Sequence, residues 1–253
     1  MKQVAGIFGF LWKVYVGVIF MILALFFYPI IFPFLYSDKN RKRAFNIFVI
    51  WSWAFRIFGG YFVKRVKTSK LPKGPYLVVA NHASYLDIFL MFSLLPRSPF
   101  LFLGKSEILK YPIIKAYFRR MNIPVFRDNK LKAAKSIVQS INSAKNGWSI
   151  VIFPEGGIPD DNNPKMIPFK NGAFQIAKAA KLPIVPISFT NNYKLFSDPS
   201  FILGPARPGI SNVYIHDYIS SEEVAKSDLE TLNKKCFKII NEPILKTHPH
   251  LAQ

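Results

Sequence analysis

The sequence predicts an α/β protein with a mostly parallel central sheet flanked by helices, preceded by an N-terminal membrane-embedded helical hairpin. Two observations predict this fold. Beyond residue 67, short apolar segments typical of buried parallel strands alternate with segments of helical pattern. Before that point, residues 14–36 carry no charge over a length sufficient to span a bilayer. We therefore divide the 253-residue chain into an N-terminal membrane-associated two-helix segment, 1–66, and a larger domain, 67–253.

The hairpin is predicted from two apolar runs, residues 14–36 and 44–62, which flank a basic cluster at 37–43. Pro29 and Pro33 lie in the first run and are expected to bend or end its helix. If both runs crossed the membrane, the basic cluster would lie opposite the rest of this basic chain, whereas positive charge is usually retained on the cytoplasmic side. A hairpin that enters one leaflet avoids the conflict. A single crossing by 14–36 with an interfacial second run is one alternative, and a buried helix pair of a soluble protein is another.

The larger domain is predicted to alternate between strands and helices. Apolar runs predict strands at 76–80, 99–104, 123–126, 148–153, 183–189 and 212–217. Helical patterns occupy 85–95, 107–119, 130–145, 172–181 and 221–243, and Asp128 is the predicted N-cap of the third helix. Such alternation implies a mostly parallel sheet covered on both faces.

The charge composition points to an anionic partner. Lys and Arg number 34 against 14 Asp and Glu, a formal charge of +20, which favours membrane lipid, nucleic acid or an acidic protein. Hydrophobic residues make up 51% of the chain, which excludes global disorder. Cys236 is the only cysteine, so no intrachain disulfide can form, as suits a domain facing the cytoplasm. No Cys/His cluster has zinc spacing, and we expect no metal.

A His–Asp pair follows the first predicted strand of the larger domain. The order is strand YLVVA, turn NHAS and helix YLDIFLMFSLL, so His82 lies on the turn and Asp87 in the first helical turn. Residues five apart on one helix would point about 140° apart, so the two can meet only in this arrangement. An Asp that binds one ring nitrogen leaves the other free to take a proton. Alone, the spacing also fits a structural pair.

The segment FPEGG, residues 153–157, follows another predicted strand at the same edge of the sheet. Gly156 and Gly157 allow the backbone to approach a ligand closely and expose amide N–H groups, and Glu155 adds an acid there. A simple glycine turn is the alternative interpretation of this segment.

Taken together, the motifs resemble those of the glycerolipid acyltransferases, the 1-acyl-glycerol-3-phosphate (lysophosphatidate) acyltransferase family. NHASYLD resembles the family's N-H-x4-D box, and FPEGG resembles F-P-E-G-T-R. The other matching segments, in the same order as in the family, are GKSEI at 104–108, IPVFRD at 123–128, FKNGAFQIA at 169–177 and PIVPISF at 183–189. The resemblance covers roughly residues 65–215, and it implies the glycerolipid acyltransferase fold with 67–253 as the catalytic domain.

The resemblance implies a role for each site residue. His82 would be the general base that takes a proton from the acceptor hydroxyl, and Asp87 would fix its tautomer. Glu155, Gly156 and Gly157 would bind the acceptor, and the glycine amides are also candidates to stabilise the developing oxyanion. The remaining implied substrate-binding residues are Lys105, Arg127 and Asn81, with Lys170 as a further phosphate candidate and turn stabilisation as the alternative for Asn81.

The implied reaction moves a fatty acyl group from an acyl thioester, acyl carrier protein or CoA, to a lysolipid hydroxyl without a cofactor. The expected acceptor is 1-acyl-glycerol-3-phosphate and the product phosphatidic acid, made at the cytoplasmic face of the cell membrane. Membrane lipids, the lysophospholipid and the thioester donor are the expected partners, and nucleic acid is not. The alternatives are a catalytically inactive membrane-binding module and a membrane-tethered nucleic-acid binder.

Two adjacent positions depart from the family pattern. Gly157 and Ile158 stand where the family box continues with Thr and a phosphate-binding Arg, so one bidentate guanidinium contact is lost. A lyso-amino-acid lipid or another lysophospholipid is therefore an alternative acceptor within the same chemistry.

Overall fold

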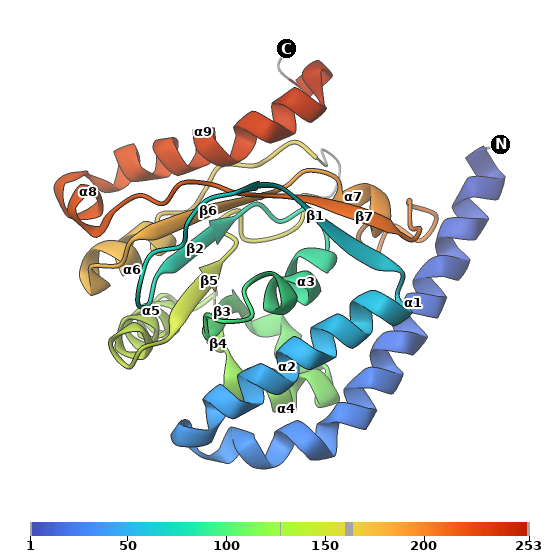
Figure 1. Ribbon diagram of the computed structural model, residues 1–253, viewed down its shortest axis with the longest axis horizontal. Coiled ribbons are helices and arrows are strands. Elements are labelled where there is room, and N and C mark those ends of the chain that lie inside the picture. Colours follow the sequence, from blue (N-terminus) through green and yellow to red (C-terminus); the bar gives the residue numbers. More distant parts are fainter. Residues whose placement is uncertain (1, 127, 160–163, 252–253) are drawn as a thin grey trace.

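A seven-stranded sheet forms the centre of the computed structural model, which describes residues 2–126, 128–159 and 164–251 (Figure 1). The strand order across the sheet is β1-β7-β6-β2-β5-β3-β4. The strands are β1 (Tyr61–Thr68), β2 (Leu77–Ala80), β3 (Phe100–Lys105), β4 (Ile123–Val125), β5 (Ser149–Ile152), β6 (Ile184–Phe189) and β7 (Gly209–Ile215). The four residues of β2 and of β5 are all buried, as their near-continuous apolar sequences, LVVA and SIVI, predict.

Five adjacent strands, β4, β3, β5, β2 and β6, run parallel to one another, which confirms the predicted mostly parallel sheet. The exception is β7, which pairs antiparallel to β6 and parallel to β1. The sequence did not predict β1, because the exposed stretch from Lys64 to Thr68 is largely basic and polar and lacks the apolar run that indicates a buried strand. This strand includes residues on both sides of the expected division between 66 and 67.

Helices cover both faces of the sheet (Figure 1). The helix α9 lies along one face, and α2, α3 and α4 cover the other. The helices of the larger domain are α3 (Leu86–Leu94), α4 (Pro112–Met121), α5 (Lys130–Lys145), α6 (Gly172–Ala180), α7 (Asn192–Leu195), α8 (Ser221–Lys226) and α9 (Leu229–Thr247), with short 3-10 turns at Ser106–Lys110 and Pro249–Leu251. The predicted helix 221–243 is in fact two helices.

Local chemistry explains where several helices begin. Pro112 opens α4, where its missing N–H costs nothing. The side chain of Asp228 caps α9 by accepting from Thr231 N at 2.8 Å. The predicted cap of α5 was wrong by one residue, because the Asn129 side chain, and not that of Asp128, accepts from the first turn, at 2.9 Å from Lys132 N.

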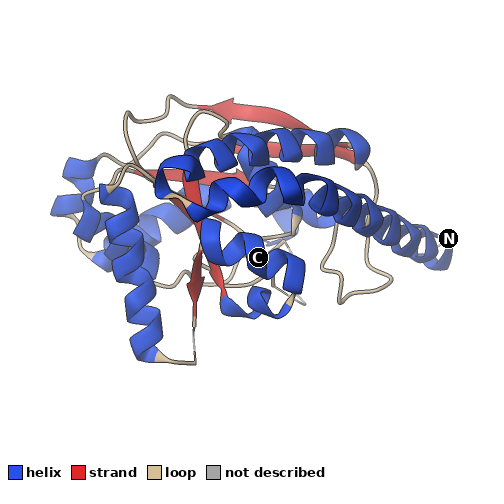
Figure 2. Ribbon diagram, turned by 90° about the horizontal axis from the view of Figure 1, so that it is seen from below, coloured by secondary structure: helices blue, strands red, loops and turns tan. Residues whose placement is uncertain are grey.

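The N-terminal segment forms two long helices, α1 (Lys2–Ile31) and α2 (Asp38–Phe58), joined by the 3-10 turn η1 (Phe32–Tyr36). Seen from below, α1 reaches beyond the rest of the molecule (Figure 2). Within the described residues, one segment, Val4–Tyr36, is long and apolar enough to cross a membrane. In its most apolar stretch of 18 residues, 28% of the residues are buried inside the protein.

The second apolar run contributes to the core through α2. Phe45 and Phe55 are fully buried, and the Ser52 hydroxyl donates to Phe89 O on α3 at 2.6 Å. The basic cluster that was expected to link two helices instead occupies the first turns of α2. One face of α2 is therefore committed to protein packing, while Trp53 and Ile57 are exposed on the other.

Candidate active site

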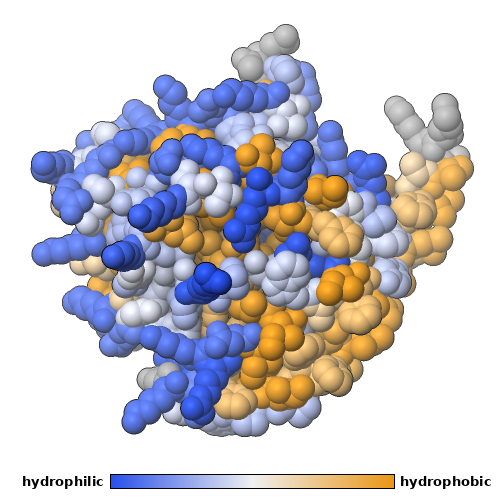
Figure 3. Space-filling model, viewed as in Figure 1, coloured by the Kyte–Doolittle hydropathy of each residue, from blue (hydrophilic) through white to orange (hydrophobic). Residues whose placement is uncertain are grey.

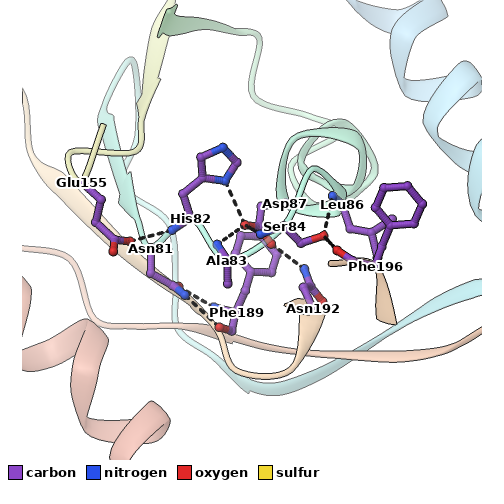
Figure 4. A network of polar contacts seen from close by, with 10 residues as sticks. All are labelled: Asn81, His82, Ala83, Ser84, Leu86, Asp87, Glu155, Phe189, Asn192 and Phe196. Atoms are coloured by element: carbon purple, nitrogen blue, oxygen red, sulfur yellow. Dashed lines mark hydrogen bonds and ion pairs between the residues drawn. The ribbon is translucent and has the colours of Figure 1, made fainter. Parts of the chain in front are cut away.

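The carboxyl ends of three neighbouring strands, β2, β5 and β6, meet at one edge of the sheet. His82 follows β2, Glu155 follows β5 and Asn192 follows β6. Figure 4 shows these side chains gathered around the turn that leads from β2 into α3. Ligands of open parallel sheets bind at this type of edge.

The His82 and Asp87 side chains meet as the turn-and-helix arrangement predicts. His82 Nδ1 lies 3.1 Å from Asp87 Oδ2, and the other ring nitrogen points away from the carboxylate (Figure 4). Asp87 Oδ2 also accepts from the backbone N–H groups of Ala83 at 2.7 Å and Ser84 at 2.9 Å. The Asp87 side chain is fully buried, whereas that of His82 is 12% exposed. The buried carboxylate is thus fixed by its neighbours, and only the imidazole reaches the surface.

Asn192 completes the surroundings of Asp87, and sequence reasoning missed it. Its Nδ2 donates to Asp87 Oδ1 at 2.7 Å, so both carboxylate oxygens accept hydrogen bonds. Asn192 is fully buried. The signal that could have found it is its position: Asn192 lies just after the predicted strand 183–189, as His82 and Glu155 lie just after theirs.

Ser84 provides a second link between the turn and the segment after β6. Its hydroxyl donates to Phe196 O at 2.6 Å and accepts from Leu86 N at 3.1 Å. The side chain therefore starts α3 and attaches it to the end of α7.

Asn81 bonds to the sheet. Its Nδ2 donates to Phe189 O at 2.9 Å, and its Oδ1 accepts from Phe189 N at 2.8 Å. This pair of bonds continues the β2–β6 pairing through a side chain and holds the start of the turn against β6.

Glu155 contacts the same turn through its carboxylate. Oε1 accepts from His82 N at 2.8 Å, and Oε2 accepts from Ile167 N at 3.0 Å. Burial raises the pKa of this carboxyl group to about 7, against the lowering effect of the two amide donors. Glu155 is 3% exposed and therefore bonds mainly to the protein backbone.

An aromatic wall backs the imidazole. The ring of Phe153 stacks on His82 with centroids 4.3 Å apart and an interplanar angle of 21°, and Phe102 stacks behind it at 6.2 Å. The stacking limits the ring orientation of His82 and keeps one side of the site apolar.

The two glycines after Glu155 have different surroundings. Gly156 has a φ of 85°, which favours glycine, and its N–H donates to Phe153 O at 3.0 Å. At Gly157, a Cβ would lie 3.1 Å from Lys105 Nζ, which places the Lys105 ammonium group directly beside this glycine. The structure thus brings Lys105 together with the FPEGG segment.

Two further cations, Arg127 and Lys170, were predicted as phosphate ligands. Arg127 lies outside the described residues. Lys170 is exposed, and its backbone N–H donates to Pro154 O at 3.0 Å. Among the residues that the structure describes, no group of three or more His, Cys, Asp or Glu side chains is arranged to hold a metal ion.

Known proteins with similar sequences and structures share one chemistry in their names. Residues 66–190 match the family described as Acyltransferase. The 1-acyl-sn-glycerol-3-phosphate acyltransferase of Saccharomyces cerevisiae is 33% identical over 179 residues, which cover 70% of this chain and 57% of that protein. The enzyme of that name from Escherichia coli K12 is 25% identical over 221 residues, or 87% of each chain. The chain thus spans little more than half of the yeast relative.

The likeness extends to a solved structure. The crystal structure of the 1-acyl-sn-glycerophosphate acyltransferase PlsC from Thermotoga maritima matches with a TM-score of 0.76 at 23% identity, over 98% of both chains. The shared fold therefore includes the two N-terminal helices as well as the sheet.

Proposed function

Because the chain belongs to the acyltransferase family, we propose that it transfers a fatty acyl group from an acyl thioester to the free hydroxyl of a lysolipid. The proposed acceptor is 1-acyl-glycerol-3-phosphate and the product phosphatidic acid, in line with the names of the relatives. The observation that best supports this chemistry is the contact of 3.1 Å between His82 Nδ1 and the buried Asp87 carboxylate at the strand edge.

His82 acts in this proposal as the general base. Its Nε2 takes the proton of the acceptor hydroxyl while that oxygen attacks the thioester carbonyl carbon. The C–S bond then breaks, and the departing thiolate receives the proton from the imidazolium, so no acyl-enzyme is formed. Asp87 keeps the proton of the neutral ring on Nδ1 and stabilises the imidazolium that forms.

Transition-state charge needs a donor near the carbonyl oxygen. The amide of Gly156 is already bonded to Phe153 O, which leaves the Gly157 amide as the better candidate of the two. Lys105 beside Gly157 is suited to bind the acceptor phosphate. Because both Glu155 oxygens accept backbone amides, Glu155 would act by shaping the turn around the acceptor.

We place the enzyme at the cytoplasmic face of the membrane. A lysolipid acceptor resides in the bilayer, and the apolar Val4–Tyr36 segment gives the chain a means of reaching it. The excess of 34 basic over 14 acidic residues suits anionic lipid and an acidic acyl carrier protein as donor, with acyl-CoA as the other candidate.

The test is acyl transfer by the purified protein, with a radiolabelled fatty acyl group carried either by acyl carrier protein or by CoA. Product on lysophosphatidate supports the proposal. Absence of product with every acceptor and both donors would contradict it and favour the inactive membrane-binding module.

A second acceptor class is favoured by one observation, because Ile158 stands where the family has a phosphate-binding Arg. A lyso-amino-acid lipid offers a carboxylate or zwitterionic head and makes no demand on that Arg. The same assay with a panel of lysolipids, scored by product mass, distinguishes the two acceptor classes. A higher kcat/KM for the amino-acid lipid than for lysophosphatidate would identify the amino-acid lipid as the preferred acceptor.

A further inference from the structure

The loop between α7 and β7, residues 197–206, exposes three consecutive large apolar side chains. Phe201, Ile202 and Leu203 are 60%, 60% and 59% exposed. A cluster of this kind at the tip of a loop is unfavourable in water, since each exposed apolar side chain retains its hydration cost. The cluster therefore needs a partner that covers it.

This 197–206 loop is fastened to the N-terminal half of α1. The Lys13 ammonium group donates to the backbone carbonyls of Phe201 and, at 3.3 Å, Asp198. Gly9 allows close contact, because a Cβ there would lie 2.7 Å from Gly204 O. The loop is thus held against α1, the helix that forms most of the candidate membrane segment.

The apolar tip adjoins a larger apolar surface on α1. Gly6 meets Leu203, since a Cβ at that glycine would lie 3.4 Å from Leu203 Cβ. Apolar surface also runs over the side of the molecule where α1 lies (Figure 3). Exposed large apolar residues line α1 along its length, among them Val4, Ile7, Leu11, Val18, Ile22 and Phe26.

The backbone of the loop is largely satisfied internally, as a segment entering lipid requires. The N–H groups of Phe201, Ile202 and Gly204 donate to Asp198 O at 3.0 Å, Ser200 O at 3.1 Å and Phe201 O at 2.9 Å. Pro199 and Pro205 have no N–H. These N–H groups would therefore need no water on insertion.

The loop is also joined to the active site by α7. Asn192 at the start of this helix donates to Asp87, and Phe196 at its end accepts from Ser84. Only residues 197–200 separate Phe196, which is bonded to the His–Asp turn, from Phe201 at the start of the apolar tip, so a fixed depth of the tip fixes the height of the site.

We propose that the 197–206 loop inserts its Phe201–Leu203 tip into the lipid bilayer, as a second membrane contact beside α1, and thereby sets the position of His82 relative to the lipid surface. The proposal rests on the membrane location given under Proposed function, but not on the acyl transfer itself.

Charge favours lipid over a second copy of the chain as the partner. Lys194 and Arg207 are exposed on either side of the loop, and the whole chain carries +20. Basic residues next to an apolar tip match anionic headgroups above hydrocarbon, whereas two such surfaces would repel each other.

The first experiment measures what the tip touches. Ile202→Cys is labelled with an environment-sensitive dye and reconstituted into vesicles of phosphatidylcholine and phosphatidylglycerol, with doxyl-labelled phospholipid as quencher. Ile22→Cys on α1, 56% exposed, is the lipid-contact control, and Val138→Cys on α5, 55% exposed, is the water control. The native Cys236 is fully buried, and wild type labelled in parallel gives the background.

A blue-shifted emission that lipid quenches at both Ile202 and Ile22, but not at Val138, is the expected result. Quenching at Ile22 with a water-like signal at Ile202 would overturn the loop contact while leaving the membrane location intact. A blue shift at Ile202 without lipid quenching would mean that protein covers the tip, and would also overturn it. A water-like signal at both positions would reject the membrane location itself.

The second experiment separates positioning from chemistry. In the variant Phe201→Ser, Ile202→Ser, Leu203→Ser, turnover of a long-chain lysolipid in vesicles should fall by about tenfold, as expected when three apolar side chains are lost from a membrane contact. Turnover of a short-chain, water-soluble lysolipid should stay within about twofold of wild type. The matched variant Leu131→Ser, Val138→Ser should change neither rate. Equal losses on both acceptors would contradict the positioning role.

Discussion

His82 is the residue on which the proposed chemistry depends, because it combines a buried carboxylate partner with a second ring nitrogen that points away from that carboxylate. Replacing it by Ala should lower turnover by roughly 10²–10⁴-fold, the usual contribution of a positioned base. Radiolabelled acyl transfer measures the rate, and an unchanged thermal midpoint shows that the fold is retained. A rate close to wild type would exclude His82 as the base.

Gly157 and Lys105 give a second test at this scale. In Gly157→Ala, the new methyl group would lie 3.1 Å from Lys105 Nζ, so the ammonium group must move. We expect the acceptor KM to rise severalfold while the donor KM stays unchanged, and Lys105→Ala should show the same pattern. Steady-state kinetics with each substrate varied decides the question. A rise confined to the donor KM would move Lys105 to the donor side.

Glu155 links the site to pH. Its carboxyl ionises near 4.5 in the unfolded chain and near 7 in the folded one, so between these values the folded state keeps a proton that the unfolded state has released. The corresponding stability is complete below about 4.5 and is lost as the pH rises through about 7; the full shift is equivalent to roughly 3 kcal/mol.

We therefore expect the thermal midpoint of the wild type to fall between pH 5 and pH 7.5 relative to that of Glu155→Gln, which cannot ionise. Scanning calorimetry of both proteins across this range measures the difference. Parallel curves for the two proteins would show that Glu155 keeps its ordinary pKa.

At the scale of elements, α2 has two roles that can be separated. Phe55 is fully buried, with its ring 5.5 Å from Trp51 and 4.9 Å from Phe89, so Phe55→Ala should lower the free energy of unfolding by about 3–5 kcal/mol. Ile57, 63% exposed on the same helix, is the matched control, and Ile57→Ala should leave stability within about 0.5 kcal/mol. Denaturant unfolding in one detergent compares them, and equal losses would contradict the core role of α2.

The elements that the sequence predicted well are those with an unambiguous local pattern. Buried strands such as β2 and β5 are near-continuous apolar runs, and the step from strand to turn to helix brings His82 and Asp87 together as expected. The strand β1 was missed because its pairing with β7 does not depend on an apolar sequence: most of it is exposed.

The supporting residues of the site were harder to predict, because their partners are distant in the chain. Asn81 bonds to Phe189, and Asn192 bonds to Asp87, across separations of 108 and 105 residues. Local pattern cannot show which strands will be neighbours, and the β2–β6 pairing that creates both contacts is a property of the assembled sheet.

For the whole molecule, the charge of +20 should make membrane binding depend on salt. Each well-placed Lys or Arg contributes about 1 kcal/mol near an anionic surface, and 0.1 M salt screens such contacts beyond about 10 Å. Binding to phosphatidylglycerol vesicles should therefore weaken as salt is raised, whereas binding to phosphatidylcholine vesicles should change little. Vesicle co-flotation measures both, and identical salt responses would show that charge does not assist binding.

The anchoring of the His82 turn to β5, β6 and α7 also has a consequence for how the enzyme matures. A newly made chain can form α3 early, but the turn has no fixed shape until segments 73 to 112 residues further along have joined the sheet. Such distant pairings are slow to form. The proposed site can therefore form only after β5, β6 and α7 have joined the sheet, and a chain assembled short of that point should be inert towards lipid.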